Sequence, residues 1–448
     1  MSSGEDRRFQ LNTGHLVGAA QFAASMAALA PFEPAPRLAA GVSGGADSMA
    51  LALLADAWAR GRGGSLLALI VDHGLRRESG AEAAGVAARL GARGIAARVL
   101  TVPGLARGSA LAERARVARF RVLVAACAGE GILHLLLGHH AADQAETVLI
   151  RALGGSGSAG MAGMAPLVEI GGLRILRPLL AVAPVELRTV VASAGATWVE
   201  DPSNFDPVAL RPRLRRLRRD RDGEGAATAA LVAAAASSGR QRADDEATIA
   251  AGLAERVSLR PEGFGVLSEG PIEPRALAAL LQTIAGAPYP PPTNSIAALA
   301  VAPRAATLVG VRLLAAGRQG AGLLVVREAA AMAPPVPALA GAVWDGRFRL
   351  GASACVPAGA MLGALGVDAA RLRRRSSLPS VVLQTLPAIR LGTTLLAVPH
   401  LLYPDPEACA GFPMIFNPPR PAGAASFLVS NARLGMHEGL RHPMLANT

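Results

Sequence analysis

The chain has 448 residues, a formal net charge of +12 and no lysine, so its 45 Lys-or-Arg positions are all arginine. Without lysine there is no P-loop of the Gly-Lys-Ser/Thr kind, no Schiff-base enzyme and no covalent adenylyl-lysine intermediate. The length predicts two or three domains, the 51% of hydrophobic residues excludes a wholly disordered chain, and the positive charge favours an anionic partner unless it reflects compositional drift.

Short apolar runs alternate with helical patterns over the first part of the chain. This alternation is typical of an α/β fold with a doubly wound parallel sheet, which helices cover on both faces. Ligands of such sheets bind beyond the carboxyl ends of the strands. The runs predict a first helix within 16–32, strands at 38–42, 66–71, 95–102 and 132–137, and helices at 47–60, 79–91 and 109–129.

The strongest local motif, Ser-Gly-Gly-Ala-Asp-Ser, closes the first predicted strand and opens a helix. Its glycines allow a turn that points backbone N–H groups at an anion, the serines add hydroxyl donors, and the helix N-terminus adds its dipole. Asp47 would repel a phosphate, so it either holds a Mg²⁺ that bridges phosphates or caps the helix. The residues expected to bind a nucleotide are Ser43, Gly44, Gly45, Ala46, Asp47 and Ser48.

Polar residues also follow the second strand and lie in the third helix. Asp72 ends the second predicted strand, where doubly wound folds place groups that contact the adenosine, and His73 beside it is either a site residue or an ordinary loop residue. Arg116 and Arg119 are three residues apart in the helix 109–129 and share a face. They are suited to clamp a leaving pyrophosphate, or they form a solvated helical face.

A further polar run follows the fourth strand, where His139 and His140 begin a helix. Two adjacent imidazoles at a helix start diverge, which disfavours a zinc site. Asp143 and Glu146 lie on one helical face, which suits binding a cationic substrate or assisting the deprotonation of an amine. The later run Glu-Asp-Pro-Ser-Asn at 200–204 either closes the site from another strand end or forms an ordinary turn.

The composition changes at a run of arginines over 211–221, which two glycines follow. We place a domain boundary there. We expect a catalytic domain at 1–222, a mainly helical middle domain at 223–330 and an α+β C-terminal domain at 331–448. The Ala-rich segment from 226 predicts the start of a long helix, and the Pro-rich stretch 333–337 predicts a linker.

The apolar runs and the cysteines indicate neither a membrane-spanning protein nor a disulfide framework. No uncharged apolar run reaches the roughly 18 residues that span a bilayer, and Cys127, Cys355 and Cys409 lie far apart. The uncharged segment 16–32 follows two arginines, as a secretion signal would. We interpret it as a helix because a nucleotide motif follows it, and we expect a cytoplasmic protein without membrane contact.

In their order along the chain, these segments resemble the tRNA(Ile)-lysidine synthetases, a family of the pyrophosphatase-loop ATPase superfamily. The first motif is shared by the whole superfamily, whereas the His-His…Asp-Gln-Ala-Glu-Thr and Glu-Asp-Pro-Ser-Asn runs are much more specific to this family. The segments that carry the resemblance are 43–48, 72–76, 115–120, 139–147, 177–180 and 200–204.

The resemblance implies a ligase that uses ATP and Mg²⁺ to modify the wobble cytidine of an isoleucine tRNA with a CAU anticodon. The cytosine C2 oxygen attacks the α-phosphate of ATP, pyrophosphate leaves, and the side-chain amine of free L-lysine then displaces AMP. The implied C-terminal domain contacts the tRNA, and a homodimer is compatible with the family. The implied roles are catalysis by Asp47, Arg116, Arg119 and Asp143, metal binding by Asp47, ATP binding by 43–48 and Asp72, lysine binding by Asp143 and Glu146, and tRNA binding by Arg76, Arg213 and Arg216.

The chain departs from the family pattern at three positions. Ala142 stands where the family usually has the first of two adjacent aspartates, Gly154 replaces an arginine, and Pro212 replaces an asparagine. Two alternatives therefore stay open. One is a pyrophosphatase-loop tRNA thiolase, which needs a cysteine although Cys127 lies within a predicted helix. The other is a tRNA-binding relative that has lost turnover.

Overall fold

The computed structural model describes residues 18–74, 78–102, 104, 111–170, 172–199, 210–220, 222–351, 353–420 and 422–423. Two compact units meet within one long helix, α9 (Ala226–Arg256), the first ending at Ala243 and the second beginning at Asp244. The predicted long helix is therefore confirmed. The expected domain boundaries at 222 and 330 stay predictions, and the second of them falls inside the second unit.

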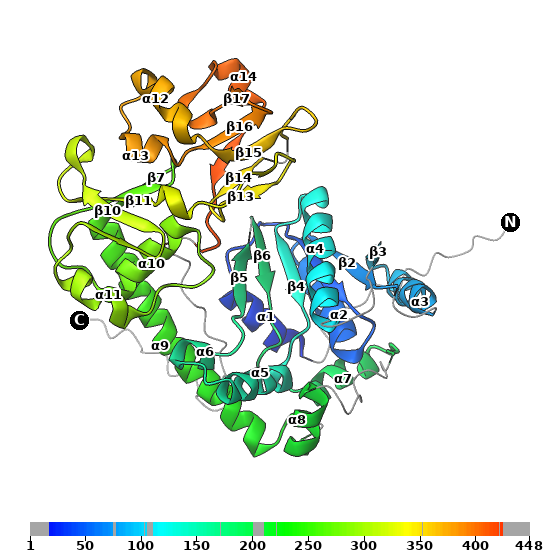
Figure 1. Ribbon diagram of the computed structural model, residues 1–448. Helices are drawn as coiled ribbons and strands as arrows, with labels where there is room; N and C mark the ends of the chain where they lie inside the picture. The colour runs from blue at the N-terminus through cyan, green and yellow to red at the C-terminus, as the bar shows by residue number, and fades with distance from the viewer. Residues whose placement is uncertain are drawn as a thin grey trace, which may run out of the picture. The chain divides into compact units, whose positions relative to one another are not determined.

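A six-stranded sheet forms the centre of the first unit (Figure 1). Its strand order is β3-β2-β1-β4-β6-β5, and all neighbours are parallel except β5, which runs antiparallel to β6 at one edge. The four predicted strands correspond to β1 to β4. The strands are β1 (Arg37–Val42), β2 (Ser65–Asp72), β3 (Ala96–Thr101), β4 (His134–Leu137), β5 (Leu167–Ile170) and β6 (Leu173–Leu176).

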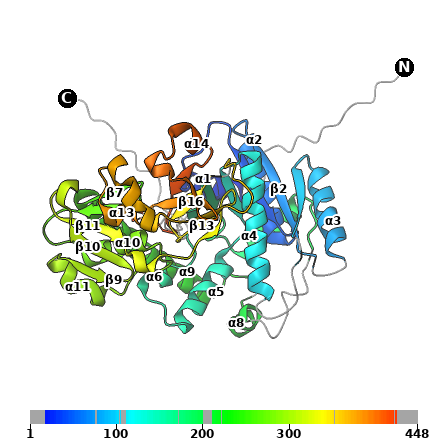
Figure 2. The same ribbon diagram turned by 45° about the horizontal axis from the view of Figure 1, so that its top comes forward.

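Helices cover both faces of this sheet, which confirms the doubly wound α/β fold. Ala40 and Val42 of β1 belong to the core that α1, α2, α3 and α7 form on one face, whereas Ala39 faces the core under α4. Figure 2 shows α4 in front of the sheet and α2 behind it. The helices are α1 (Ala19–Ala28), α2 (Ala46–Arg60), α3 (Ser79–Gly91), α4 (Leu111–Glu130), α5 (Ala141–Leu153), α6 (Ser158–Met161), α7 (Pro184–Ser193) and α8 (Leu210–Arg218).

The sequence pattern explains why the strands of this sheet are apolar almost throughout. A strand that is buried on both faces cannot alternate apolar and polar residues, so β4 reads His-Leu-Leu-Leu and is buried along its whole length. The polar residues are displaced to the loops that follow the strands. Because β1, β2, β4 and β6 are parallel neighbours, the residues after their carboxyl ends meet at one edge of the sheet.

The second unit contains a five-stranded sheet that the sequence analysis did not predict. Its strands are only three to five residues long, and residues of Pro274–Ala285 (α10) and Thr293–Val301 (α11) pack with it in one core. Strands this short carry too little period-2 pattern to be recognised. In sheet order they are β7 (Val257–Arg260), β8 (Phe264–Leu267), β11 (Leu323–Arg327), β10 (Val311–Ala315) and β9 (Ala306–Leu308).

Two smaller antiparallel sheets complete the second unit. The stretch predicted as a linker supplies one edge strand, because β12 (Val336–Pro337) pairs with β15 (Met361–Ala364); this part of the linker prediction was wrong. The other strands are β16 (Pro387–Leu391) and β17 (Thr394–Ala397), and β13 (Val343–Trp344), β14 (Phe348–Leu350) and β18 (Met414–Phe416). The short helices are α12 (Ala369–Leu372), α13 (Ser380–Leu383) and α14 (Pro406–Ala410), with 3-10 turns η2 (Gly317–Gln319), η3 (Ala329–Ala331), η4 (Gly366–Asp368), η5 (Arg373–Arg375) and η6 (Pro399–Leu401).

A buried ion-pair network joins the two halves of the second unit. The carboxylate of Asp345 accepts hydrogen bonds from Arg327 Nε at 3.1 Å and Arg347 Nε at 2.8 Å. Arg327 belongs to the five-stranded sheet, whereas the other two residues lie between β13 and β14. The interaction ties segments on either side of the predicted boundary at 330 into one compact unit.

Candidate active site

The loop 43–48 connects the carboxyl end of β1 to the first turn of α2. Gly44 has a φ of +89°, and a Cβ atom at this position would lie 2.6 Å from Val86 Cγ2. Only glycine adopts this conformation readily in so small a space. Ser48 braces the loop from within, because its hydroxyl accepts from Ser43 N at 3.1 Å and donates to Gly45 O at 2.9 Å.

This bracing separates the roles of the two serines that the sequence analysis treated alike. The side chain of Ser48 is buried and its hydroxyl is engaged inside the loop, whereas Ser43 is exposed at the carboxyl end of β1. The Ser43 N–H is engaged by Ser48, and the exposed Ser43 hydroxyl lies 3.2 Å from the Ser48 hydroxyl, from which it could turn toward a ligand. Ser48 sets the shape of the turn.

His140 links this loop to the start of α5. Its Nε2 lies 3.4 Å from Asp47 Oδ2 and 3.5 Å from Asp143 Oδ2. His140 also caps α5, since its Nδ1 accepts from Asp143 N at 3.3 Å while Asp143 Oδ2 accepts from His140 N at 3.3 Å. Although burial opposes it, the charge of Asp143, with that of Asp47, raises the pKa of His140.

Arg215 pairs with Asp143 and Glu146, the two acids that were expected to bind lysine. Glu146 is fully buried, and its Oε1 accepts from Arg215 Nε at 2.6 Å. Arg215 Nη2 also donates to Glu146 Oε2 at 3.3 Å and to Asp143 Oδ1 at 3.5 Å. Arg211 Nη1 lies 3.9 Å from both carboxylates. The acids are brought together as expected, but in this structure they pair with a cation of the same chain.

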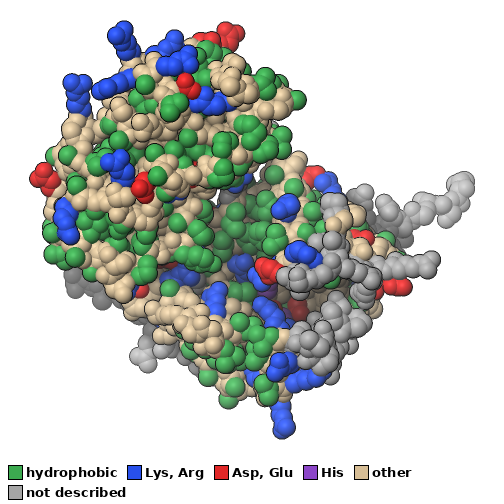
Figure 3. Space-filling view, in the orientation of Figure 1, with side chains coloured by type: hydrophobic (Ala, Val, Ile, Leu, Met, Phe, Trp, Pro, Cys, Tyr) green, Lys and Arg blue, Asp and Glu red, His purple; other side chains and the backbone are tan. Residues whose placement is uncertain are grey.

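These cations come from α8, which lies beside α5 in Figure 1. In Figure 3, basic side chains gather over the same lower region of the molecule. Arg213 and Arg216, which the sequence analysis assigned to tRNA, are exposed on α8, whereas Arg215 turns toward the acids. The basic run therefore divides into inward and outward arginines, and sequence reasoning missed the inward pair. Its signal was the spacing of Arg211 and Arg215 on one face of a helix.

The predicted cations of α4 lie at the same edge of the sheet. Arg119 is half-buried, and its Nη2 lies 3.9 Å from where a Cβ atom would stand on Gly41, near the end of β1. Burial lowers the pKa of the Arg119 guanidinium, and the nearby Arg116 lowers it further. Arg116 itself is exposed.

Asp72 braces the chain after β2 rather than projecting freely. Its Oδ1 accepts from Gly74 N at 2.9 Å. A hydrogen bond from Ser79, followed by the one from Gly74, lowers the pKa of Asp72. Arg76 and the run 200–204, which the sequence analysis also assigned to the site, lie outside the described residues.

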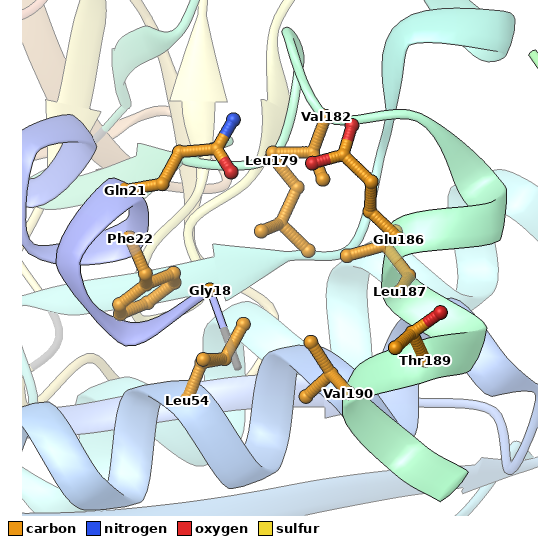
Figure 4. A pocket seen from close by; sticks show the side chains of 10 residues that line it. All are labelled: Gly18, Gln21, Phe22, Leu54, Leu179, Val182, Glu186, Leu187, Thr189 and Val190. Carbon is orange, nitrogen blue, oxygen red and sulfur yellow. The ribbon is translucent and has the colours of Figure 1, made fainter. Parts of the chain in front are cut away.

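A separate cavity of about 200 Å³ opens between α1, α2 and α7 (Figure 4). Its lining is mostly apolar, with Phe22 and Leu54 on one side and Leu187 and Val190 on another. Glu186 reaches it, but this carboxylate also accepts from Ala183 N at the start of α7. The cavity is lined by none of the predicted site residues.

Comparisons with known proteins show the family to which this chain belongs. The family model described as a PP-loop domain matches residues 19–219. The tRNA(Ile)-lysidine synthase of Bradyrhizobium sp. (strain BTAi1 / ATCC BAA-1182) is 41% identical over 56% of this chain and 72% of its own length. The chain belongs to the tRNA(Ile)-lysidine synthase family. It is an enzyme of the ATP-dependent ligase class.

Two further relatives show how far the similarity extends. The tRNA(Ile)-lysidine synthase of Hyphomonas neptunium is 38% identical over 61% of this chain and 77% of its own length. That of Ruegeria pomeroyi is 34% identical over 82% of this chain and 89% of its own. Among solved structures, the U34-tRNA thiolase NcsA from Methanococcus maripaludis with its [4Fe-4S] cluster has a TM-score of 0.41 and 15% identity, covering 48% of this chain and 77% of that one.

Metal ligands are sparse among the described residues of this family member. Among them, no three His, Cys, Asp or Glu side chains gather to hold a metal ion. A Mg²⁺ ion that is bound mainly through substrate phosphates needs only one or two carboxylates, which fits Asp47. No helix in the described part of the chain is long and apolar enough to cross a membrane.

Proposed function

We propose that this chain ligates L-lysine to C2 of the wobble cytidine in the CAU anticodon of an isoleucine tRNA. The observation that carries the proposal is the short chain of contacts from Asp47 through His140 to Asp143. It connects the phosphate loop at one end to a buried pair of acids at the other. In this proposal, the nucleotide and the amine bind at the two ends of one network.

In the first step, the cytosine C2 oxygen attacks the α-phosphate of ATP, and the bond to the β-phosphate breaks. The loop 43–48 binds the phosphates through backbone N–H groups and Ser43. Arg119, with Arg116 nearer the solvent, stabilises the negative charge that develops on the departing pyrophosphate. Asp47 would hold Mg²⁺, which when bound neutralises phosphate charge.

In the second step, the side-chain amine of lysine attacks C2, and the bond from C2 to oxygen breaks to release AMP. The ammonium group loses one proton before the attack and a second one afterwards. Asp143 and Glu146 are the acids suited to attract the ammonium. Arg215 already pairs with both carboxylates. The lysine ammonium must therefore bind beside Arg215 or displace it from them.

The recognition of the RNA is proposed on the surface of α8. Arg213 and Arg216 are exposed on this helix, so phosphate binding suits them. Arg76, a homodimer and a cytoplasmic location stay predictions. The same holds for an RNA contact made by residues 331–448.

The thiolase alternative is disfavoured by the only cysteine of the first unit. Cys127 is buried in α4, and burial raises the pKa of its thiol to about 11. A thiol of that kind is inert at neutral pH because the thiolate is the reactive form. The alternative of an inactive tRNA-binding relative is tested together with the main proposal.

The test is tRNA-dependent exchange of pyrophosphate into ATP, followed by transfer of labelled lysine. We expect both reactions in the wild-type protein with the cognate tRNA. Exchange without lysine transfer would reject the lysidine proposal. If neither reaction is observed, the alternative of an inactive tRNA-binding relative is favoured. Asp47→Ala should lose exchange while retaining tRNA binding, whereas Asp222→Ala, on an exposed ion pair with Arg188 away from the loop, should retain both.

A further inference from the structure

The two acids proposed for lysine binding already have cationic partners within the chain. Both oxygens of Glu146 accept hydrogen bonds from Arg215, at 2.6 and 3.3 Å, and Arg215 Nη2 also donates to Asp143 Oδ1 at 3.5 Å. Arg211 Nη1 lies 3.9 Å from an oxygen of each carboxylate, which is beyond hydrogen-bond distance. The positions that a lysine ammonium needs on Glu146 are therefore the ones that Arg215 fills.

The two partners of this ion pair differ in their access to solvent. The side chain of Glu146 is 0% exposed, whereas that of Arg215 is 37% exposed. Arg215 can turn outward by rotation of its own long side chain, but Glu146 stays buried on α5. A buried carboxylate without a cation is costly, so the departure of Arg215 requires another cation in its place. An ammonium group, with three hydrogen-bond donors and one positive charge, meets that requirement.

Arg215 shares α8 with the arginines proposed to bind RNA. Arg213 and Arg216 are exposed on this helix. Arg218 Nη1 donates to the carbonyl oxygen of Ala142 at 3.3 Å, which attaches α8 to α5 independently of Arg215. The helix can therefore stay in place while one side chain moves. RNA phosphates on its outer surface would supply the negative charge that a displaced guanidinium loses.

We propose that Arg215 exchanges between the two acids and an RNA phosphate, and that this exchange couples lysine binding to RNA binding. Without RNA, Arg215 competes with the ammonium for Asp143 and Glu146, so free lysine binds weakly. With RNA on α8, a phosphate compensates the displaced guanidinium, and lysine binds more tightly. The identity of the amine and of the RNA rests on the proposed function. Lysine would thus enter the site mainly when the RNA that accepts it is present.

The test measures the linkage between the two ligands on the full-length protein, without ATP. Equilibrium dialysis with labelled L-lysine gives the Kd for lysine with and without a saturating RNA hairpin that has a CAU anticodon loop. In the wild type, the hairpin should lower the Kd for lysine roughly tenfold, within the usual range for coupled sites. Saturating lysine should lower the Kd for the hairpin by the same factor, because linkage is reciprocal.

Two variants of Arg215 and one control on the same helix isolate the exchange. Arg215→Gln has no charge to exchange, so without the hairpin it should bind lysine more tightly than the wild type does. The hairpin should then change its Kd for lysine less than about twofold. Arg215→Lys keeps a cation and should retain most of the coupling. Arg213→Gln removes the same charge from the outer surface, so it should bind the hairpin more weakly and keep the coupling once the hairpin saturates.

A measurement on the wild type decides the question if Arg215→Gln fails to fold. Phenylglyoxal modifies accessible guanidinium groups, and mass spectrometry of the digested protein follows the modification of Arg215. Saturating L-lysine should raise the rate of this modification, because the displaced guanidinium faces solvent. L-norleucine lacks the side-chain ammonium and should leave the rate unchanged.

The proposal is overturned if the hairpin leaves the Kd for lysine of the wild type unchanged, or if Arg215→Gln shows the coupling of the wild type. It is also overturned if lysine fails to raise the rate at which Arg215 is modified. Neither measurement requires lysine transfer. Intact coupling in a protein that does not transfer lysine would reject the proposed function and keep the exchange. Lysine transfer without coupling would support the proposed function and reject the exchange.

Discussion

Arg215 Nε lies 2.6 Å from Glu146 Oε1, and this contact holds α8 against α5 at a carboxylate that is fully buried. The ion pair has a consequence for both halves of the proposed reaction. α8 also carries the exposed arginines proposed for RNA binding, so it contributes residues both to the proposed lysine site and to the proposed RNA surface.

Replacing Arg215 should therefore destabilise the protein and increase the stabilisation that it gains from added lysine. Arg215→Gln leaves a buried carboxylate without its cation, which costs on the order of 1–3 kcal/mol because the arginine is partly exposed. Free L-lysine should raise the melting temperature of this variant more than that of the wild type, since its ammonium replaces the lost charge. Differential scanning fluorimetry with and without lysine measures this, and Arg213→Gln is the control.

An equal response of both proteins to lysine would show that the amine does not bind at Asp143 and Glu146. A weaker response of Arg215→Gln would assign Arg215 to lysine binding instead, for example to the α-carboxylate. Each outcome is distinct because the control variant carries the same change of charge on the same helix.

Gly44→Ala should damage ATP binding. The new methyl group meets Val86 Cγ2 at 2.6 Å, and the φ of +89° is unfavourable for alanine. We expect a destabilisation of roughly 1–3 kcal/mol and at least a tenfold rise in the KM for ATP. The double variant Gly44→Ala/Val86→Ala removes the clash and keeps the backbone strain, so it should recover only part of the loss. Full tolerance of Gly44→Ala would contradict the loop conformation.

Arg213→Ala should weaken RNA binding through lost phosphate contact. The expected signature is a slope of log K against log salt that is smaller by about one, with little change in sequence preference. Anisotropy titrations of the CAU hairpin at several salt concentrations supply the slopes. Arg98→Ala, on β3 and paired with Glu130, is the control. An unchanged slope for Arg213→Ala would remove this residue from the RNA surface.

Acid should destabilise the protein through His134, on β4. This imidazole is buried, with its Nε2 2.9 Å from Glu33 Oε2. Burial lowers its pKa, against the influence of Glu33, so the folded protein binds a proton less readily than the unfolded chain does. Above the ordinary pKa of 6.5, His134 is neutral in both states and the protein keeps its full stability. As the pH falls below 6.5, the unfolded chain binds the proton first, and the free energy of unfolding falls.

Urea unfolding at pH 7.5 and pH 5.5 measures this loss. The free energy of unfolding should fall more between these two pH values in the wild type than in His134→Gln, which has no proton to bind. Parallel losses in the two proteins would show that other groups cause the acid sensitivity.

The sequence by itself determined the sheet and the phosphate loop. Strands that are buried on both faces appear in the sequence as apolar runs. The turn of the loop requires a glycine, which stands at position 44. Both signals are local in the sequence. The short strands of the second unit carry no such signal, which is why the sheet containing β9 was missed and the strand β12 was interpreted as linker.

Only the tertiary structure decided the partners of the charged side chains. Asp143 and Glu146 were predicted to share a face, yet nothing local shows that Arg215, 69 residues beyond Glu146, neutralises them. Ser43 and Ser48 look equivalent in the motif, and only their burial distinguishes them. Helical and strand periodicity can be recognised from residues that are neighbours in the sequence. Electrostatic pairing depends on distances that exist only after the chain has folded.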